Sequence, residues 1–348
     1  MAGKEPLIES NNPSELIEIM RKKKLVLMLG VCTLFAYSFQ ACKSDNSGST
    51  TGTTTTKPKD TTTPPPKQEK FYKVNADSAY DFVAKQVAFG PRVPGTIAHQ
   101  RCAKYLASEL GRFADTVLLN QGPMTTFRRK TLIVKNVIGV FNAEAKKRIL
   151  LAAHYDTRPH ADEDPQRPTE PADGANDGAS GVGVILEIAR QFAIEKPKVG
   201  VDIIFFDAED GGMRNGNSES WCLGSQYWAA NPHVPMYSAS YGILLDMVGA
   251  ADAHFGYEAY SINTAQGAMV KVWNMAQRLG HGNYFLSVLS GSITDDHVFV
   301  NKGRGIPMID IIDYDLASGT GFGDFWHTHK DNMDVIDKKT LNAVGETV

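Results

Sequence analysis

The feature of this sequence that most constrains its fold is a set of apolar runs. Each run ends in an acidic or histidine side chain. The runs before His154, Glu209 and Asp246 consist mainly of Ile, Leu, Phe and Ala. Such runs are typical of strands buried on both faces of a mainly parallel sheet, and ligands bind such sheets beyond the carboxyl ends of the strands. We therefore expect the polar residues that follow these runs to meet at one edge of a sheet.

Helical and strand patterns alternate along the chain from residue 71. The patterns predict helices over 75–90, 95–113, 180–194, 225–230 and 265–279, and strands over 116–120, 127–134, 136–142, 148–154, 201–206, 241–247 and 308–312. This alternation predicts a three-layer α/β sandwich in one domain, residues 71–348, with a central mixed, mostly parallel sheet flanked by helices. The last segment, KKTLNAVGETV, starts as a helix without a stop signal, which predicts a helix cut short.

The polar residues at the ends of the apolar runs have the chemistry of a metal site. They are His154, Asp156, Asp177, Glu209, Asp210, Asp246, Asp295, Asp296, His297 and His327. Carboxylates collected in one place repel one another unless a cation lies between them. Oxygen and nitrogen donors of this kind suit Zn²⁺.

The first seventy residues are typical of an exported protein. Residues 1–19 are an extension of uncertain status before Met20, and 20–41 have a basic segment followed by an apolar core too short for a comfortable membrane span. Ala41 precedes Cys42 in a pattern that resembles a bacterial lipoprotein signal, although Phe39 stands where Leu is usual. We therefore expect an exported, periplasmic or outer-membrane lipoprotein of a Gram-negative bacterium, lipidated at Cys42, with plain secretion as the alternative.

Residues 43–70 are rich in Ser, Thr, Pro and Lys, which predicts a disordered linker. In the domain that follows, Cys102 and Cys222 are interpreted as two buried thiols, with a disulfide between them as the alternative. The formal charge of −3 gives no reason to expect a nucleic-acid partner. We expect a monomer whose contact with the membrane is the lipid anchor alone.

Six motifs occur in the order seen in the zinc aminopeptidase-like M28 superfamily. They are HYDT, GANDGASGVGVILEIAR, FFDAED, LLDMVGA, DDHVF and WHTHKDN. Within that superfamily the chain most resembles glutaminyl cyclases, which convert the N-terminal glutamine of peptides to pyroglutamate. The resemblance covers roughly residues 72–348 and implies a peptide or protein N-terminus as substrate and one zinc ion as cofactor.

The resemblance implies a role for each matching residue. Asp177, Asp210 and His327 match the three zinc ligands, although many relatives have Glu where this chain has Asp210. Glu209 matches the catalytic acid and base. The other matches are two aspartates beside the reaction, Asp246 and Asp295, and two aromatic pocket residues, Trp326 and, more weakly, Trp221.

His154 and Asp156 keep an alternative function open. His154 matches a ligand in two-zinc relatives, whereas in glutaminyl cyclases the matching histidine lies beside a one-zinc site, and we expect Asp156 to orient His154 or a neighbouring loop. A two-zinc aminopeptidase is therefore the first alternative, and an inactive zinc-containing binding lipoprotein is the second. Asp295 and Trp326 favour the cyclase, because aminopeptidases of this type usually have other residues at both positions.

Overall fold

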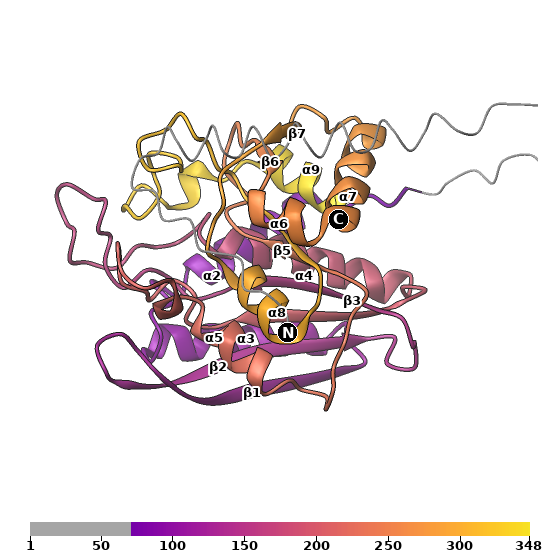
Figure 1. The fold of residues 1–348 in the computed structure, drawn as a ribbon, viewed down its shortest axis with the longest axis horizontal. Helices are drawn as coiled ribbons and strands as arrows, with labels where there is room; N and C mark the ends of the chain where they lie inside the picture. The colour runs from indigo at the N-terminus through magenta and orange to yellow at the C-terminus, as the bar shows by residue number, and fades with distance from the viewer. Residues whose placement is uncertain (1–70) are drawn as a thin grey trace, which may run out of the picture. The chain divides into compact units, whose positions relative to one another are not determined.

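The computed structural model describes residues 71–348. The predictions for the extension 1–19, the signal 20–41, the lipidation of Cys42 and the linker 43–70 lie outside the described residues. Six strands form the central sheet in the order β1-β2-β4-β3-β5-β8, and Figure 1 shows β1 and β2 at the lower edge of the view. Its strands are β1 (Thr116–Thr125), β2 (Thr131–Phe141), β3 (Arg148–His154), β4 (Gly200–Phe206), β5 (Gly242–Leu245) and β8 (Met308–Ile311). The four strands β4, β3, β5 and β8 run parallel, whereas β1 and β2 are antiparallel to their neighbours. The predicted mixed, mostly parallel sheet is confirmed.

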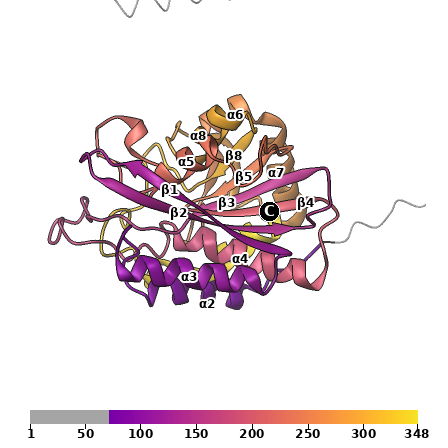
Figure 2. The same ribbon diagram turned by 90° about the horizontal axis from the view of Figure 1, so that it is seen from below.

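Helices cover both faces of this sheet, as Figure 2 shows with α2, α3 and α4 on one side and α5 and α8 on the other. The helices are α2 (Ala76–Val87), α3 (Ile97–Gly111), α4 (Ala179–Ile194), α5 (Leu223–Ala230), α6 (Ala259–Thr264), α7 (Gln266–Leu279), α8 (Asp296–Arg304) and α9 (Lys338–Thr347). Two short 3-10 turns, η1 (Ser218–Ser220) and η2 (Met333–Val335), and a two-stranded sheet of β6 (Phe255–Tyr257) and β7 (Phe285–Leu289) complete the described part.

The alternation of side chains along the buried strands explains the three layers. On β3, Leu151 and Ala153 pack into the core on the α2–α4 side, whereas Leu150 and Ala152 pack into the opposite core with Trp228 of α5. Successive strand residues point to opposite faces, so a strand without polar residues must be covered on both. The apolar runs of the sequence therefore require helices on both sides.

Two predicted strand boundaries are wrong. The first is the end of β1, which continues to Thr125 instead of ending at residue 120. The segments predicted as two strands, 127–134 and 136–142, form the single strand β2, and residues 127–130 belong to the turn after β1. Lys135 separates the two predicted strands, but it pairs with Gln121 of β1 and continues the strand. The next residue, Asn136, is also polar, and its side chain is buried and paired. Its Nδ2 donates to Asn120 Oδ1 and to the carbonyl of Gly224, and its Oδ1 accepts from the Asp207 amide. A fully paired buried amide does not break a strand.

None of the helices within residues 71–348 has the length and apolar character that crossing a membrane requires. Cys102 and Cys222 are both buried and free, so the interpretation as two separate thiols is confirmed.

Candidate metal centre and catalytic pocket

The predicted site residues converge where the parallel strands end, and Figure 1 shows the long connecting loops gathered at that end of the sheet. His154 is the last residue of β3, and Asp246 directly follows β5. Glu209 and Asp210 lie just beyond β4, and Asp295 is the N-cap of α8. Asp177 comes from the loop before α4, and His327 from the loop between β8 and η2. Strand direction thus brings together residues that are far apart in the sequence.

Asp177, Asp210 and His327 form one compact set of possible metal ligands, whose donor atoms lie within 4.8 Å of one another. His327 Nε2 is 3.2 Å from Asp210 Oδ1 and 3.8 Å from Asp177 Oδ2. All three side chains are buried, and Asp210 Oδ2 has no hydrogen-bond partner among the described residues. A buried carboxylate oxygen without a partner is unfavourable unless a cation or a donor reaches it.

This ligand set fits zinc by its donors and by its charge. Two carboxylates and one imidazole are donors that catalytic zinc sites use, and three protein ligands leave one position for a substrate. Burial alone would lower the pKa of His327, but the carboxylates of Asp210, Asp162 and Asp177 raise it to about 9. The buried carboxylates thus attract a positive charge, which a divalent cation supplies.

Asp162 and Arg158 contact the ligand set on the side away from the proposed metal position. The sequence did not predict a role for either residue. Asp162 Oδ1 lies 3.1 Å from His327 Nδ1, which leaves Nε2 directed at Asp210 and Asp177. Arg158 donates to both Asp162 oxygens and, through Nη1, to the backbone carbonyl of Asp210. A carboxylate behind a ligating histidine fixes the ring orientation and its tautomer.

Two buried aspartates hold the backbone of the ligand-bearing loops. Asp156 Oδ1 accepts from the Glu209 amide at 3.0 Å, and its Oδ2 accepts from the Asp210 amide at 3.2 Å. Asp331 does the same for the amides of Asn176 and Asp177, at 2.7 and 3.1 Å. Asp156 is also 3.5 Å from His154 Nδ1, so it contacts both His154 and the neighbouring loop.

His154 forms a second set that shares Asp177 with the first. Its Nε2 lies 3.0 Å from Asp177 Oδ1 and 3.1 Å from Asp246 Oδ1. Gly178 makes room for this ring, because a Cβ at Gly178 would lie 2.4 Å from His154 Nε2. The three side chains could hold a second metal ion. They could equally be joined by protons, because the carboxylates around His154 overcome its burial and raise its pKa well above the ordinary value.

Glu209 and Asp295 face each other beside the first ligand set. Their carboxyl oxygens and the Cys222 sulfur lie within 4.8 Å of one another, and Cys222 Sγ donates to Glu209 Oε1 at 3.2 Å. Burial raises the pKa of Glu209 well above its ordinary value, and the charges of Asp295 and Asp210 raise it further. Burial and the charge of Asp246 raise the pKa of Asp295 to about 7. Such a carboxyl pair retains a proton near neutral pH.

A buried charged network holds the loop that presents Asp295. His297 lies 3.3 Å from Glu258 Oε2 and 3.7 Å from Asp310 Oδ2, and Glu258 Oε1 accepts from the Ile293 amide. His297 is fully buried in this network, which gives it a structural role, and the neighbouring Asp296 is fully buried as well. The sequence did not predict a role for Glu258 or Asp310, because neither belongs to a motif with recognisable spacing.

Aromatic side chains wall the pocket in front of these carboxylates, which has a volume of about 480 Å³. Trp326 and Trp221 both line it, together with Phe322. The Trp326 ring stacks on His327 with centroids 3.6 Å apart, and Trp221 lies against the guanidinium of Arg158 at 4.6 Å. The structure thus places both predicted tryptophans in the pocket. Trp326 lies against the proposed ligand His327, and Trp221 lies against Arg158, which holds the ligand loop.

Comparison with known proteins identifies the family. Residues 136–348, which carry all six motifs, match the model of peptidase family M28. The chain belongs to peptidase family M28. Within this family it is similar to the solved structure of a Zn-dependent exopeptidase from Parabacteroides distasonis, at 52% identity and a TM-score of 0.78, over 80% of this chain and 97% of the other.

Two further similar proteins are named as a glutaminyl cyclase and a glutaminyl-peptide cyclotransferase. The chain is similar to the solved structure of Porphyromonas gingivalis glutaminyl cyclase, at 51% identity and a TM-score of 0.77, over 79% of this chain and 96% of the other. It is 30% identical over 243 residues to a glutaminyl-peptide cyclotransferase of Gloydius blomhoffii, over 61% of this chain. The match spans 62% of the length of that relative.

Proposed function

We propose that this M28 protein is a zinc-dependent glutaminyl-peptide cyclotransferase, which converts the N-terminal glutamine of a peptide to pyroglutamate and releases ammonia. The observation that carries the proposal is the Glu209–Asp295 pair, buried within 4.8 Å beside the ligand set. Two carboxyl groups that share a proton can take a proton from an amine and return it to a leaving amide nitrogen. The relatives named glutaminyl cyclase support the same conclusion.

Asp177, Asp210 and His327 would hold the zinc ion. When bound, zinc would supply Lewis-acid polarisation of the γ-carboxamide of the substrate glutamine. The three residues hold their donor atoms in one buried cluster, and Asp162, Arg158, Asp156 and Asp331 keep them there through the contacts described above. The chain thus supplies a preformed centre, which requires little rearrangement when the substrate arrives.

Glu209 would move the proton. The α-amine nitrogen attacks the γ-carbonyl carbon, a C–N bond closes the five-membered ring, and the bond to the amide nitrogen breaks. A Glu209 carboxylate oxygen accepts the proton that the α-amine loses and donates it to the departing nitrogen, which leaves as ammonia. Water is neither consumed nor required. Nucleophile and electrophile belong to one residue, so the pocket needs only to fold the glutamine side chain back on its own amine.

Asp246 and Asp295 would hold the two nitrogens by hydrogen bonds on either side of Glu209. Asp295 Oδ2 is buried and has no hydrogen-bond partner among the described residues, so it is available to a donor from the substrate. Trp326 and Trp221 would form the apolar walls for the glutamine methylenes. The same walls would keep bulk water from competing with the amine.

The second candidate is a two-zinc aminopeptidase, and the contact of His154 with Asp177 and Asp246 is the observation that favours it. We propose one zinc, because the carboxylates that surround His154 allow a proton to bridge the same groups. Asp295 also lies where it pairs with Glu209, which suits proton sharing between carboxyl groups better than activation of water by Glu209 alone.

A product assay on peptide substrates tests the proposed function. We expect a glutaminyl peptide to yield ammonia and the pyroglutamyl peptide in equal amounts, and a leucyl peptide to yield no free leucine. Mass spectrometry distinguishes cyclisation, which lowers the peptide mass by one ammonia, from cleavage, which removes a residue. Release of free amino acids from both peptides would show an aminopeptidase instead.

We further propose that Cys42 carries a lipid, that the linker 43–70 connects it to the catalytic domain, and that the protein acts as a monomer on exported peptides or proteins. The leader sequence supports this proposal. Mass spectrometry of the protein from its native membrane checks it, because lipidation adds a diacylglyceryl mass at Cys42.

A further inference from the structure

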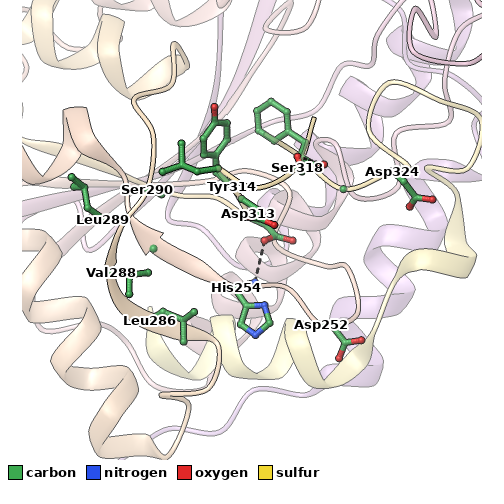
Figure 3. A pocket seen from close by; sticks show the side chains of 15 residues that line it. Asp252, His254, Leu286, Val288, Leu289, Ser290, Asp313, Tyr314, Ser318 and Asp324 are labelled. Carbon is green, nitrogen blue, oxygen red and sulfur yellow. Dashed lines mark hydrogen bonds between the residues drawn. The ribbon is translucent and has the colours of Figure 1, made fainter. Parts of the chain in front are cut away.

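A second cavity, of about 590 Å³, opens beside the catalytic pocket and is called here the acidic groove (Figure 3). Its lining includes apolar side chains and carboxylates, together with His254 and the aromatic rings of Tyr314 and Phe322. Figure 3 shows Leu286, Val288 and Leu289 of β7 on one side, and Asp252, Asp313 and Asp324 on the other. The proposed reaction uses none of these residues.

Three chain segments pass from the wall of the catalytic pocket into the wall of the groove. Ile293 lines the pocket and Ser290, three residues earlier, lines the groove. Ile312 lines the pocket and the next residue, Asp313, lines the groove, while Phe322 lines both. The two cavities therefore share these segments as a common wall, and a peptide held by its first residue in the pocket would continue into the groove over the rim of that wall.

The acidic side of the groove has few cations to balance it. Asp252 and Asp315 are exposed, and the side-chain Oδ1 of Asp315 accepts from the amide of Ala317. Asp324 is paired with Lys330 at 2.9 Å. Asp313 accepts from the His254 amide, and burial raises its pKa. Carboxylates gathered on one wall favour a cationic ligand.

The opposite side of the groove offers an apolar surface and one unused polar atom. Val288 and Leu289 are 55% and 63% exposed, a large fraction for side chains of this kind in neighbouring positions. Ser290 is 7% exposed, and its Oγ has no hydrogen-bond partner among the described residues. A buried hydroxyl that lines a cavity without a partner is available to a donor or acceptor in a ligand.

A further cavity, lined in part by Phe127, Arg158 and Arg214, is less suited to a continuing peptide. Arg214 lines both the pocket and that cavity, but it is held in an ion pair with Glu163, which also lines the pocket. This ion pair joins two residues of the pocket wall where the pocket meets the further cavity.

We propose that the acidic groove binds the part of the substrate peptide that follows the N-terminal glutamine, and that it selects peptides with Lys or Arg next to an apolar residue. The inference rests on the proposed function and adds a substrate class to it. The basic side chain contacts the wall of Asp252 and Asp315, and the apolar residue covers Val288 and Leu289. A peptide backbone group pairs with Ser290 Oγ.

A substrate series tests this proposal on the purified protein. The peptides are glutaminyl hexapeptides in which a single Lys, or a single Glu, moves from the second to the sixth position beside a Leu. We expect kcat/KM for the Lys peptide to exceed that for the Glu peptide by about tenfold at the best position, and the ratio to fall as salt rises, since the groups are partly exposed. The double variant Asp252→Asn/Asp315→Asn should bring the ratio close to one.

Controls separate this inference from the proposed function. The matched double variant Asp81→Asn/Glu144→Gln removes two exposed carboxylates that do not line the groove, and it should keep the full Lys preference. The dipeptide Gln-Ala is too short to reach the groove, and wild type and both variants should cyclise it equally. If the Lys preference is absent, or if it survives Asp252→Asn/Asp315→Asn, the acidic groove does not select the peptide. Turnover of Gln-Ala in the same experiment would still support the proposed cyclase activity. Failure to cyclise even Gln-Ala would overturn both.

Discussion

Glu209→Gln is expected to lower kcat for cyclisation by about a thousandfold or more, while zinc content remains at the wild-type level. General acid and base catalysis contributes about 10² to 10⁴ in rate, and here one carboxyl group performs both steps. Gln has nearly the same shape and its amide oxygen can still accept from Cys222 Sγ, so the pocket is expected to keep its structure. Steady-state ammonia release and metal analysis of the same sample measure both quantities.

The control for Glu209→Gln is Glu144→Gln, which makes the same chemical change at an exposed position outside the catalytic pocket. It should leave kcat unchanged. A Glu209→Gln protein that kept more than a tenth of the wild-type kcat would remove Glu209 from the proton transfer. A Glu209→Gln protein without zinc would show that Glu209 acts through the metal site instead.

His327→Ala is expected to weaken zinc binding by about a thousandfold or more and to abolish turnover at micromolar zinc. It removes one of three protein ligands, and no other histidine within residues 71–348 contacts both Asp177 and Asp210. Asp162→Asn should have a smaller effect, about 10- to 100-fold on zinc affinity, because it removes only the carboxylate behind the ring. Competition with a fluorescent chelator measures the zinc affinity of the wild type and of the two variants, His327→Ala and Asp162→Asn.

His329→Ala is the matched control, since His329 lies two residues from His327 but pairs with Asp164 outside the ligand set. It should retain zinc and activity. Equal zinc loss in His329→Ala and His327→Ala would mean that the whole loop, rather than the imidazole of His327, determines binding. Full zinc affinity in His327→Ala would exclude it as a ligand.

The sequence predicts the layers of this fold well because burial imposes a clear pattern on its strands. β3 and β4 have no exposed residue, so each reads as an apolar run, and a run of that kind requires helices on both faces. The split prediction for β2 failed because hydrophobicity cannot show that Lys135 pairs with Gln121 of β1, or that the neighbouring Asn136 finds partners on β1 and α5. The short elements β6, β7, α6 and α8 were missed, since they are too brief to show a period.

The residues that face the substrate were predictable, whereas those that support them were not. Asp177, Asp210 and His327 occur in ordered motifs, and the structure brings them into one ligand set. Asp162 and Arg158 act through contacts between distant segments, and nothing in their local sequence distinguishes them from ordinary loop residues. The same reason applies to Glu258 and Asp310, which reach His297 from separate elements.

Zinc titration of the metal-free protein tests the central claim most directly, with cyclase activity on a glutaminyl peptide followed in the same samples. The account predicts that activity rises linearly to one zinc per chain and then stays constant, and that His154→Ala leaves this end point unchanged. An end point of two zinc ions per chain, lowered to one by His154→Ala and accompanied by release of free amino acids, would contradict it.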